Sequence, residues 1–249
     1  MKLDFIIAGV QKAGTTALWR FLRQHPEIAL SETKELHFFD NESLDWSKPP
    51  YQRITIQFDN AARVRIRGEA TPIYTYWPPA MERIRSYNAN IKLIVILRNP
   101  VELAYSQWRM ERARGNERLS FAEAIRGGRE RVANATQLAG YHRIYSYVER
   151  GFYAAQLSRM FSLFPREQVL LLRQPDLKND HRAVLDQICE FLKIAPFSEY
   201  PAAKIVFSHE AVQVPVVDEA DAAYLSEMYR SDLETMMREY GLDLFPGPS

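Results

Sequence analysis

Short apolar segments alternate with longer segments of helical periodicity along most of the chain. The predicted strands are short runs rich in aliphatic and β-branched residues that are bounded by turn residues, at 3–8, 64–69, 92–97 and 168–172. The predicted helices repeat their apolar positions every three or four residues, at 14–24, 79–88, 101–114, 121–132, 144–161, 181–192 and 218–240. This alternation predicts an α/β fold of three layers, with a central parallel sheet flanked by helices.

The remaining segments do not divide the chain. Residues 41–58 have no clear period and include Pro49-Pro50, which indicates a surface excursion between two elements. The sequence has no internal repeat, low-complexity tract or linker, and 47% of its 249 residues are hydrophobic, enough for one substantial core. The prediction is a single domain over residues 1–249.

Composition narrows the class of protein. The 32 Lys and Arg residues nearly balance the 31 Asp and Glu residues, and a net charge of +1 argues against a nucleic-acid binder. The lone cysteine, Cys189, allows neither a disulfide nor a Cys/His zinc site, and no metal site is predicted. The chain shows no signal region and no apolar segment of membrane-spanning length, so a soluble, cytoplasmic protein is expected.

The clearest candidate for chemistry is the stretch GVQKAGTT, residues 9–16, between the first predicted strand and the first predicted helix. Glycines and small residues expose successive backbone N–H groups there, and the following helix N-terminus adds partial positive charge, which suits a phosphate. The spacing G-x4-G-T-T imitates the Walker loop, but Thr15 occupies the position of its lysine, and Lys12 lies inside the loop instead.

The displaced lysine favours a reaction other than triphosphate cleavage. No strand ends in an Asp placed to hold Mg²⁺, since the predicted strand at 92–97 is followed by Arg98. A group whose leaving group is a phosphate could be transferred with one lysine at the bridging oxygen and without metal. A solvent-facing lysine in an ordinary glycine-rich loop is the alternative.

A second candidate is the segment SETKELHFFD, residues 31–40. Glu35 and His37 are two residues apart and would share one side of an extended chain, where either could accept a proton from an attacking hydroxyl. A surface-paired Glu35 and a packed His37 form the alternative interpretation.

A third candidate is Arg98 together with Ser106, in the run KLIVILRNPVELAYSQW. Arg98 stands at the carboxyl edge of its strand, where open α/β sheets bind ligands, and Ser106 lies two turns into the next predicted helix. A guanidinium and a hydroxyl could hold a further phosphate, although Arg98 could equally pair with a surface carboxylate.

Taken together, these segments resemble a known family. The residues FIIAGVQKAGTTAL, HPEIAL, KELHFFD, LIVILRNPVELAYS and GFYAAQL, in this order, resemble the nucleotide-dependent sulfotransferases, particularly the branch with the heparan sulfate (glycosaminoglycan) enzymes. The resemblance covers most of the chain from Leu3 to about Leu192 and indicates a soluble member of the bacterial type.

The resemblance implies a P-loop-like sheet and the donor 3′-phosphoadenosine 5′-phosphosulfate (PAPS), with 3′-phosphoadenosine 5′-phosphate (PAP) as product and no required metal. Matching positions imply that Arg98 and Ser106 hold the 3′-phosphate, and that Lys12 meets the bridging oxygen as sulfate leaves. Glu35 matches the catalytic base of the glycosaminoglycan branch, and His37, a supporting residue there, competes because a histidine is the base in the cytosolic branch. The implied 5′-phosphosulfate contacts are Gln11, Lys12, Ala13, Gly14, Thr15 and Thr16.

Two departures affect the acceptor. Ala70 stands where the glycosaminoglycan enzymes usually have a lysine, so a second basic contact is missing or comes from elsewhere, such as Arg67 or His209. The family's late basic, glycine-containing loop and the heparan enzymes' paired cysteines have no match between Leu192 and the last predicted helix. A heparan-type acceptor is therefore less well supported than the reaction.

Transfer to a hydroxyl, or less readily an amine, of a carbohydrate or other small molecule is the expected function. The alternatives are a P-loop kinase-like enzyme and a non-catalytic nucleotide-binding module. Aromatic residues that could border an acceptor cleft, or fill the core instead, are Tyr51, Tyr74, Tyr76, Trp77 and Trp108. The sequence predicts no oligomeric state.

Overall fold

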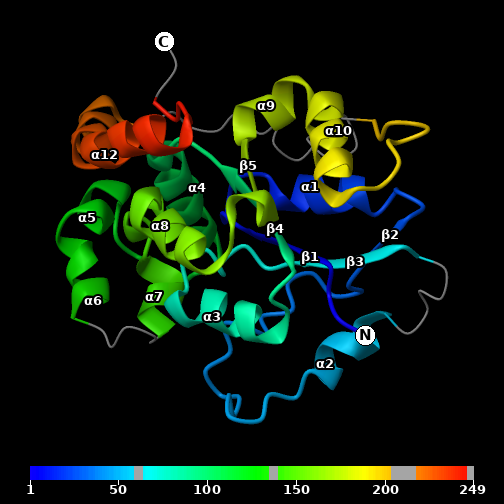
Figure 1. Cartoon of the computed structure of the whole chain (residues 1–249). Coiled ribbons are helices and arrows are strands. Elements are labelled where there is room, and N and C mark those ends of the chain that lie inside the picture. The colour runs from blue at the N-terminus through cyan, green and yellow to red at the C-terminus, as the bar shows by residue number, and fades with distance from the viewer. Residues whose placement is uncertain (59–63, 135–139, 203–216, 246–249) are drawn as a thin grey trace. The chain divides into compact units, whose positions relative to one another are not determined.

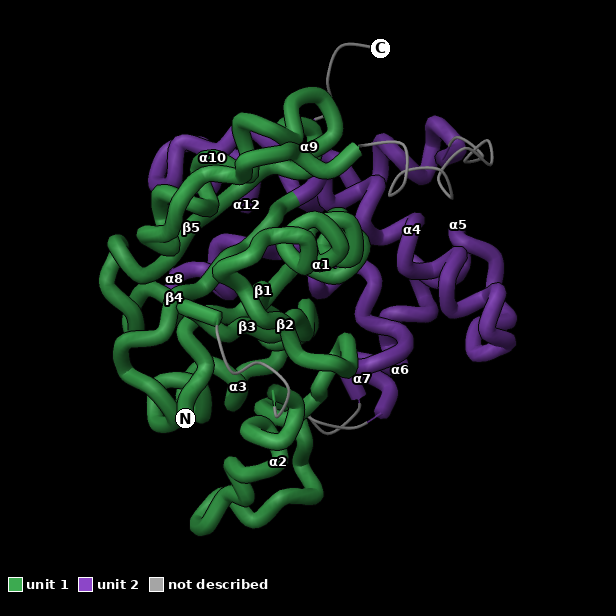
Figure 2. The backbone as a smooth tube through the Cα atoms, turned by 90° about the vertical axis from the view of Figure 1, so that its right-hand side faces the viewer, with its two compact units in different colours: residues 1–97, 159–214 green, residues 98–158, 215–249 purple. Residues whose placement is uncertain are grey.

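The computed structural model describes residues 1–58, 64–134, 140–202 and 217–245 (Figure 1). The chain forms two compact units, shown in different colours in Figure 2. Unit 1 comprises residues 1–97 and 159–214, and unit 2 comprises residues 98–158 and 215–249. Compact units can be parts of one domain, so the single domain over residues 1–249 stays a prediction.

Unit 1 is built on a five-stranded parallel sheet with the strand order β2-β3-β1-β4-β5. The central strands β1 and β4 are buried almost throughout, because helices cover both faces of the sheet. Their pairing places Ile7 beside Ala70 on one side and Ile94 on the other. The strands are β1 (Phe5–Gly9), β2 (Ile28–Leu30), β3 (Ile66–Ala70), β4 (Lys92–Leu97) and β5 (Val169–Arg173).

Helices lie on both faces of this sheet, which confirms the predicted three-layer α/β fold. Helices α1 (Thr15–Leu22), α9 (Gln174–Asn179) and α10 (His181–Leu192) lie on one face, and α3 (Pro78–Tyr87) lies on the other (Figure 1). The short helix α2 (Gln52–Thr55) is part of the excursion predicted for residues 41–58. The unit also contains two 3₁₀ turns, η1 (Ile56–Phe58) and η4 (Arg166–Gln168).

Unit 2 is helical in its described part. The Tyr229 hydroxyl of the long helix α12 (Glu219–Tyr240) donates to the carbonyl oxygen of Val148 at 2.8 Å. The Asp232 carboxylate accepts the N–H groups of Tyr153 and Ala154, at 2.9 and 3.1 Å, and so caps the helix that begins at Tyr153. Helix α8 (Tyr153–Leu163) begins in unit 2 and ends in unit 1. The other elements are α4 (Pro100–Ala113), α5 (Phe121–Ile125), η2 (Gly127–Arg129), α6 (Glu130–Ala133), α7 (Gly140–Tyr145), η3 (Glu149–Gly151) and α12 (Glu219–Tyr240).

Two predicted helices are broken in the structure. The helix predicted over 121–132 divides into α5, η2 and α6 at Gly127-Gly128, since glycine favours a break. The helix predicted over 144–161 is wrong in its first half, where a turn and η3 precede α8. Gly151 is the last residue of the 3₁₀ turn η3, and a Cβ atom there would come within 2.7 Å of Tyr229 and 2.8 Å of Pro100. Close packing at this glycine therefore fixes the turn.

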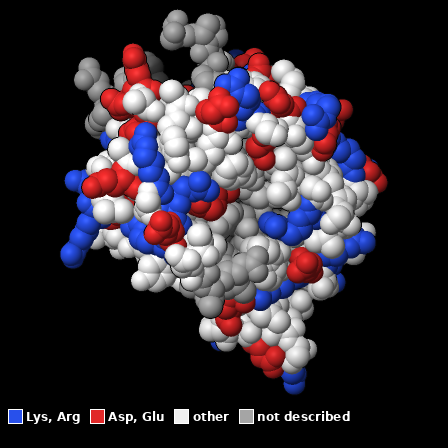
Figure 3. Space-filling model, turned by 90° about the vertical axis from the view of Figure 1, so that its left-hand side faces the viewer, with Lys and Arg blue, Asp and Glu red and all other residues white. Residues whose placement is uncertain are grey.

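Charged side chains of both signs are interspersed over the face shown in Figure 3. This distribution matches the near balance of 32 basic and 31 acidic residues in the sequence.

Candidate active site

The loop between β1 and α1 has an unusual backbone. Lys12 and Gly14 have φ angles of 69° and 97°, in the left-handed region, so neighbouring N–H groups of the loop turn toward one side. The N–H of Val10 donates to the carbonyl oxygen of Ile96 at 2.8 Å, which ties the start of the loop to β4. At Gly9 a Cβ atom would lie 2.2 Å from Thr75 Oγ1, so only glycine fits where the loop leaves the sheet.

Helix α1 presents an open N-terminus to this loop. Its first hydrogen bond runs from the N–H of Leu18 to the carbonyl oxygen of Gly14, so the preceding N–H groups have no partner within the helix. Its first turn has no acidic residue, and no side chain in the described part of the chain caps it. The partial positive charge of the helix is therefore available to an anion.

The residues predicted to bind the sulfuryl donor lie in this loop and in the first turn of α1. Gln11 and Lys12 are half-buried, and Ala13 and Thr15 are buried. Thr16 is exposed in the first turn of α1. Leu177 of α9 lies 3.4 Å from the position that a Cβ atom of Gly14 would occupy, so α9 closes one side of the loop. That these residues hold a phosphosulfate stays a prediction.

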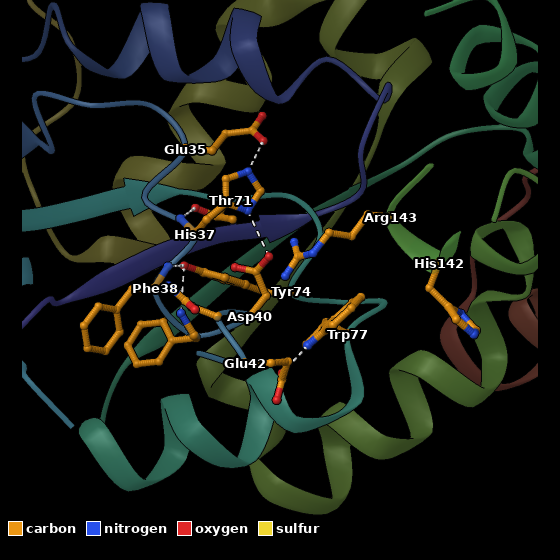
Figure 4. A network of polar contacts seen from close by, with 12 residues as sticks. Glu35, His37, Phe38, Asp40, Glu42, Thr71, Tyr74, Trp77, His142 and Arg143 are labelled. Atoms are coloured by element: carbon orange, nitrogen blue, oxygen red, sulfur yellow. Dashed lines mark hydrogen bonds and ion pairs between the residues drawn. The ribbon is translucent and has the colours of Figure 1, made fainter. Parts of the chain in front are cut away.

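The segment between β2 and α2 places one imidazole ring between two carboxylates and a lysine beside one of them. Figure 4 shows the His37 ring between the carboxylates of Glu35 and Asp40. His37 Nδ1 lies 2.9 Å from Asp40 Oδ2, and His37 Nε2 lies 3.4 Å from Glu35 Oε2. Lys34 Nζ lies 2.8 Å from Glu35 Oε1. Glu35 and His37 thus do meet, as their spacing predicted, and Asp40 holds the ring from its other nitrogen.

The array fixes the protonation of both candidate bases. The hydrogen bond to Asp40 and the one to Glu35 raise the pKa of His37 from its ordinary value to about 9, although partial desolvation of this half-exposed ring acts in the opposite direction. Burial raises the pKa of Glu35, but hydrogen bonds from His37 and Lys34 outweigh it and lower the pKa below the ordinary value. At neutral pH, Glu35 is therefore a carboxylate and His37 an imidazolium.

This assignment predicts how stability depends on pH. Because the folded-state pKa of His37 is raised to about 9, its ion pairs stabilise the protein fully below the ordinary pKa of about 6.5. That stabilisation is lost as the pH rises through about 9. The melting temperature of the wild type should exceed that of His37→Gln near neutral pH, and the two should converge above about pH 9. A difference that does not change with pH would contradict the raised pKa.

Buried contacts hold the array on the sheet. Asp40 is fully buried, and the Tyr74 hydroxyl accepts the N–H groups of Phe38 and Phe39 at 3.1 and 3.3 Å. The Glu42 carboxylate accepts the indole N–H of Trp77 at 2.7 Å (Figure 4). Asp40 was missed as a site residue in the sequence, although it lies in the same KELHFFD motif three residues after His37.

Arg98 and Ser106 belong to unit 2 and are described within it. Arg98 directly follows β4, and its Nε and Nη2 atoms lie 2.9 and 2.8 Å from Glu102 Oε2. The Tyr153 hydroxyl donates to the carbonyl oxygen of Arg98 at 2.9 Å, which fixes the backbone there. Ser106 is half-buried on α4. The carboxylate pairing considered for Arg98 is thus present, and its phosphate contact stays a prediction.

The remaining residues considered for the acceptor site differ in burial. Tyr74 and Trp77 are fully buried and are core residues, whereas Tyr51, Tyr76 and Trp108 are half-buried. Ala70 is fully buried. The backbone of Arg67 pairs with Asp4, which precedes β1, at the opposite end of that strand from the loop. His209 lies outside the described residues.

Comparison with protein families gives a match over most of the chain. The profile of the sulfotransferase domain matches residues 2–208. The chain belongs to the sulfotransferase family. The predicted family, the predicted enzyme class and the P-loop-like α/β fold are thereby confirmed.

Curated proteins similar to this sulfotransferase include enzymes of heparan sulfate. The human bifunctional heparan sulfate N-deacetylase/N-sulfotransferase 3 is 26% identical over 238 residues, which is 90% of this chain and 26% of that protein. The human heparan sulfate glucosamine 3-O-sulfotransferase 5 is 29% identical over 196 residues, which is 78% of this chain and 55% of that protein. The sulfotransferase thus spans about a quarter to about half the length of these relatives.

Solved structures agree with the family. A sulfotransferase from Alicyclobacillus acidocaldarius is 26% identical, with a TM-score of 0.82 and 98% coverage of both chains. A sulfotransferase domain from the curacin biosynthetic pathway, 15% identical with a TM-score of 0.56, shares the fold and covers 92% of this chain and 98% of its own.

In residues 1–58, 64–134, 140–202 and 217–245, no cluster of three or more His, Cys, Asp or Glu side chains is arranged to hold a metal ion. None of the helices described there is long and apolar enough to cross a membrane.

Proposed function

We propose that this sulfotransferase moves a sulfuryl group from PAPS to a hydroxyl, and less readily to an amine, of a carbohydrate or other small molecule. The observation that carries the proposal is the Glu35–His37–Asp40 array, which keeps a proton acceptor ionised beside a cationic imidazole. A module that only binds nucleotide has no use for such a proton acceptor.

The donor is assigned to the two groups of residues that the sequence predicted. Loop N–H groups, the α1 N-terminus and the hydroxyls of Thr15 and Thr16 would hold the 5′-phosphosulfate. Arg98 and Ser106 would hold the 3′-phosphate. Metal independence is part of the proposal, because Lys12 can neutralise the leaving phosphate that a metal would otherwise stabilise.

The proposed reaction is an in-line transfer. The Glu35 carboxylate takes the proton of the acceptor hydroxyl while the oxygen attacks sulfur, and the bond from sulfur to the bridging oxygen breaks. Lys12 stabilises the negative charge that develops on that oxygen as PAP leaves. Atoms balance, since the proton goes to Glu35 and the sulfuryl group to the acceptor oxygen.

His37 is the competing base, and its environment favours a supporting role. A pKa of about 9 leaves it protonated at neutral pH, where an imidazolium cannot accept a proton. As a cation it instead fixes Glu35 Oε2 and leaves that carboxylate ionised.

The relatives and this chain together support the proposed class of acceptor. The heparan sulfate relatives named above support a carbohydrate. Ala70, in the place of the family's usual lysine, removes a basic contact and leaves smaller, less anionic acceptors open. A cytoplasmic location, the absence of nucleic-acid partners and the single domain over residues 1–249 remain predictions.

Transfer of label tests the proposed function directly. Purified protein is incubated with PAPS carrying labelled sulfate, with EDTA, against a panel of neutral sugars, heparan fragments, phenols and amines. Label in an acceptor, with PAP formed in equal amount, is the expected result. Consumption of ATP with Mg²⁺ instead would support the kinase-like alternative, and PAPS binding with no turnover on any acceptor would support the non-catalytic module.

The Arg98–Glu102 pair gives a prediction for donor affinity. Arg98→Ala should weaken PAP binding at least about tenfold, because hydrogen bonds to a charged group contribute about 1.5–3 kcal/mol. Glu102→Gln removes the charge of this carboxylate partner and should tighten binding by up to about fivefold, the scale of an exposed ion pair. Calorimetric titration with PAP measures both. Equal affinity in Arg98→Ala and the wild type would remove Arg98 from the donor site.

A further inference from the structure

Glu69 is a buried carboxyl group to which the proposed mechanism gives no role. It lies near the carboxyl end of β3, directly before Ala70, and is fully buried. Its Oε2 atom accepts a hydrogen bond from the Thr71 hydroxyl at 2.7 Å. Its Oε1 atom is buried and has no hydrogen-bond partner among the described residues. A buried carboxyl oxygen without a hydrogen-bond partner costs stability, which calls for a reason other than packing.

Hydrogen bonds connect Glu69 to the segment that carries the proton acceptor. A hydroxyl has one proton, and Thr71 gives it to Glu69, so a lone pair of Thr71 Oγ1 is directed to another donor. That donor is the backbone N–H of His37, at 3.4 Å (Figure 4). Glu69 therefore sets the direction in which Thr71 accepts.

The backbone at His37 needs such a restraint. Its φ angle is 49°, in the left-handed region that residues with a side chain rarely occupy and that surrounding contacts must hold. The ring that this backbone carries lies 3.4 Å from Glu35 Oε2. A shift of the His37 backbone would move the ring and with it the carboxylate that the ring orients.

We propose that Glu69 is a positioning residue for the proton acceptor: through the Thr71 hydroxyl it holds the left-handed turn at His37 and so fixes the position of Glu35. The inference rests on the proposed role of Glu35 as base. Glu69 is fully buried, and the effect proposed for it passes through Thr71 and His37.

The charge of Glu69 matters because of its surroundings. Burial raises its pKa to about 8, with the hydrogen bond from Thr71 opposing the rise and the charge of Asp40 adding to it. The titratable groups that face it are Asp40 and His37 from the segment after β2, Tyr74 from the turn after β3, and Tyr87 from α3. Glu69 is thus neutral at pH 7, and its ionisation at higher pH places a second buried negative charge near Asp40.

Substitution of Thr71 tests the connection. Thr71→Val keeps the shape of the side chain and removes both hydrogen bonds, and Thr71→Ser restores them. We expect Thr71→Val to lower kcat about ten- to hundredfold, the scale of a misplaced catalytic group, with PAP affinity within about twofold of the wild type. Thr71→Ser should recover most of the turnover. A folded Thr71→Val enzyme with the wild-type kcat would overturn the proposal, as would equal losses in Thr71→Val and Thr71→Ser.

Substitution of Glu69 tests its charge. Glu69→Gln keeps an oxygen that accepts from Thr71 but cannot ionise, and Glu167→Gln, at an exposed carboxylate of unit 1, is the matched control. In the wild type and the control, kcat should begin to fall near pH 8. In Glu69→Gln the fall should move toward the pKa of His37, about 9. An unchanged pH profile in Glu69→Gln would overturn the role given to its charge.

A measurement without turnover separates this inference from the proposed function. NMR titration of the His37 ring should give a lower pKa in Thr71→Val than in the wild type, because the ring leaves its place between two carboxylates. If no acceptor is sulfated but this pKa changes, the proposed function fails and the connection stands. If sulfation occurs and depends on Glu35 but the pKa of His37 is the same in both proteins, only the positioning role fails.

The pH dependence of protein stability provides a second test, and its direction is fixed by the raised pKa of Glu69. A folded-state pKa raised to about 8 means that the stabilisation by neutral Glu69 is complete below about pH 4.5 and is lost as the pH rises to about 8. The melting temperature of the wild type relative to Glu69→Gln should fall over this range and then level off. A constant difference would show that Glu69 ionises as freely in the folded protein as in the unfolded chain, against the inference.

Discussion

Replacing Lys12 by alanine is expected to lower turnover at least about hundredfold, the usual scale for one electrostatic group aimed at a developing charge. The backbone of Lys12 is in the left-handed conformation, so its N–H group and those of its neighbours turn toward one side of the loop. The residue itself is half-buried. The loss should appear in kcat, because the charge that Lys12 meets develops only as the bridging bond breaks. Steady-state kinetics with PAPS and a sulfated acceptor measure it.

Two variants make this prediction specific. Lys48→Ala removes an exposed lysine from the same unit and should leave turnover unchanged. Lys12→Arg keeps the charge but spreads it over a larger group, and should recover only part of the rate. Near-normal turnover in Lys12→Ala would make Lys12 an ordinary loop residue and remove the proposed stabilisation of the leaving group.

Replacing Glu35 by glutamine should lower turnover by about a hundredfold or more, toward the limit of detection, since general bases contribute about 10²–10⁴ in rate. The amide keeps the size of the side chain but cannot take a proton. PAP affinity should stay within about threefold of the wild type, because the role proposed for Glu35 is toward the acceptor. Titration calorimetry and turnover, measured on the same preparation, separate a base from a binding residue.

Neighbouring variants decide between the two candidate bases. Glu32→Gln, at an exposed carboxylate in the same segment, is the control and should behave as the wild type. His37→Ala should lose part of the activity, because Glu35 then loses the cation that orients it. If His37→Ala were inactive while Glu35→Gln turned over normally, the assignment of the base to Glu35 would be wrong.

The sequence was sufficient for the layers of the fold because the long apolar runs follow simple periods. The strands predicted at 92–97 and 168–172 lie within a residue of β4, which is buried almost throughout, and of the edge strand β5, which is partly buried. Strand β2 was missed because three residues are too few to show a period. The break in the helix predicted over 144–161 depends on the approach of Tyr229, far along the chain, to Gly151, and no local pattern records it.

The candidate site also has one part that the sequence predicted and one part that only the structure shows. The spacing of Glu35 and His37 indicated one shared side, and the structure places their carboxylate and imidazole 3.4 Å apart. What the spacing could not show is the left-handed turn at His37, which brings Asp40 to the other ring nitrogen. The protonation of the two candidates depends on that third side chain, so the sequence alone left the choice of base open.

Arg98 shows the limit of reading one residue at a time. Its place after a buried strand predicted a ligand contact, while Glu102, four residues later in the first turn of α4, is close enough in sequence to form an ion pair with it. The structure contains the ion pair with Glu102. A phosphate would have to compete with Glu102 for the guanidinium, and the sequence does not show which of the two binds it.

The measurement that tests the account most directly is a calorimetric comparison of two nucleotides on the wild-type protein. PAP is titrated with EDTA present, and ATP is titrated with Mg²⁺. The account predicts clear binding of PAP without metal and no comparable binding of ATP, because the loop holds a lysine for a bridging oxygen in place of the Walker lysine. Binding of ATP with Mg²⁺ and none of PAP would contradict it.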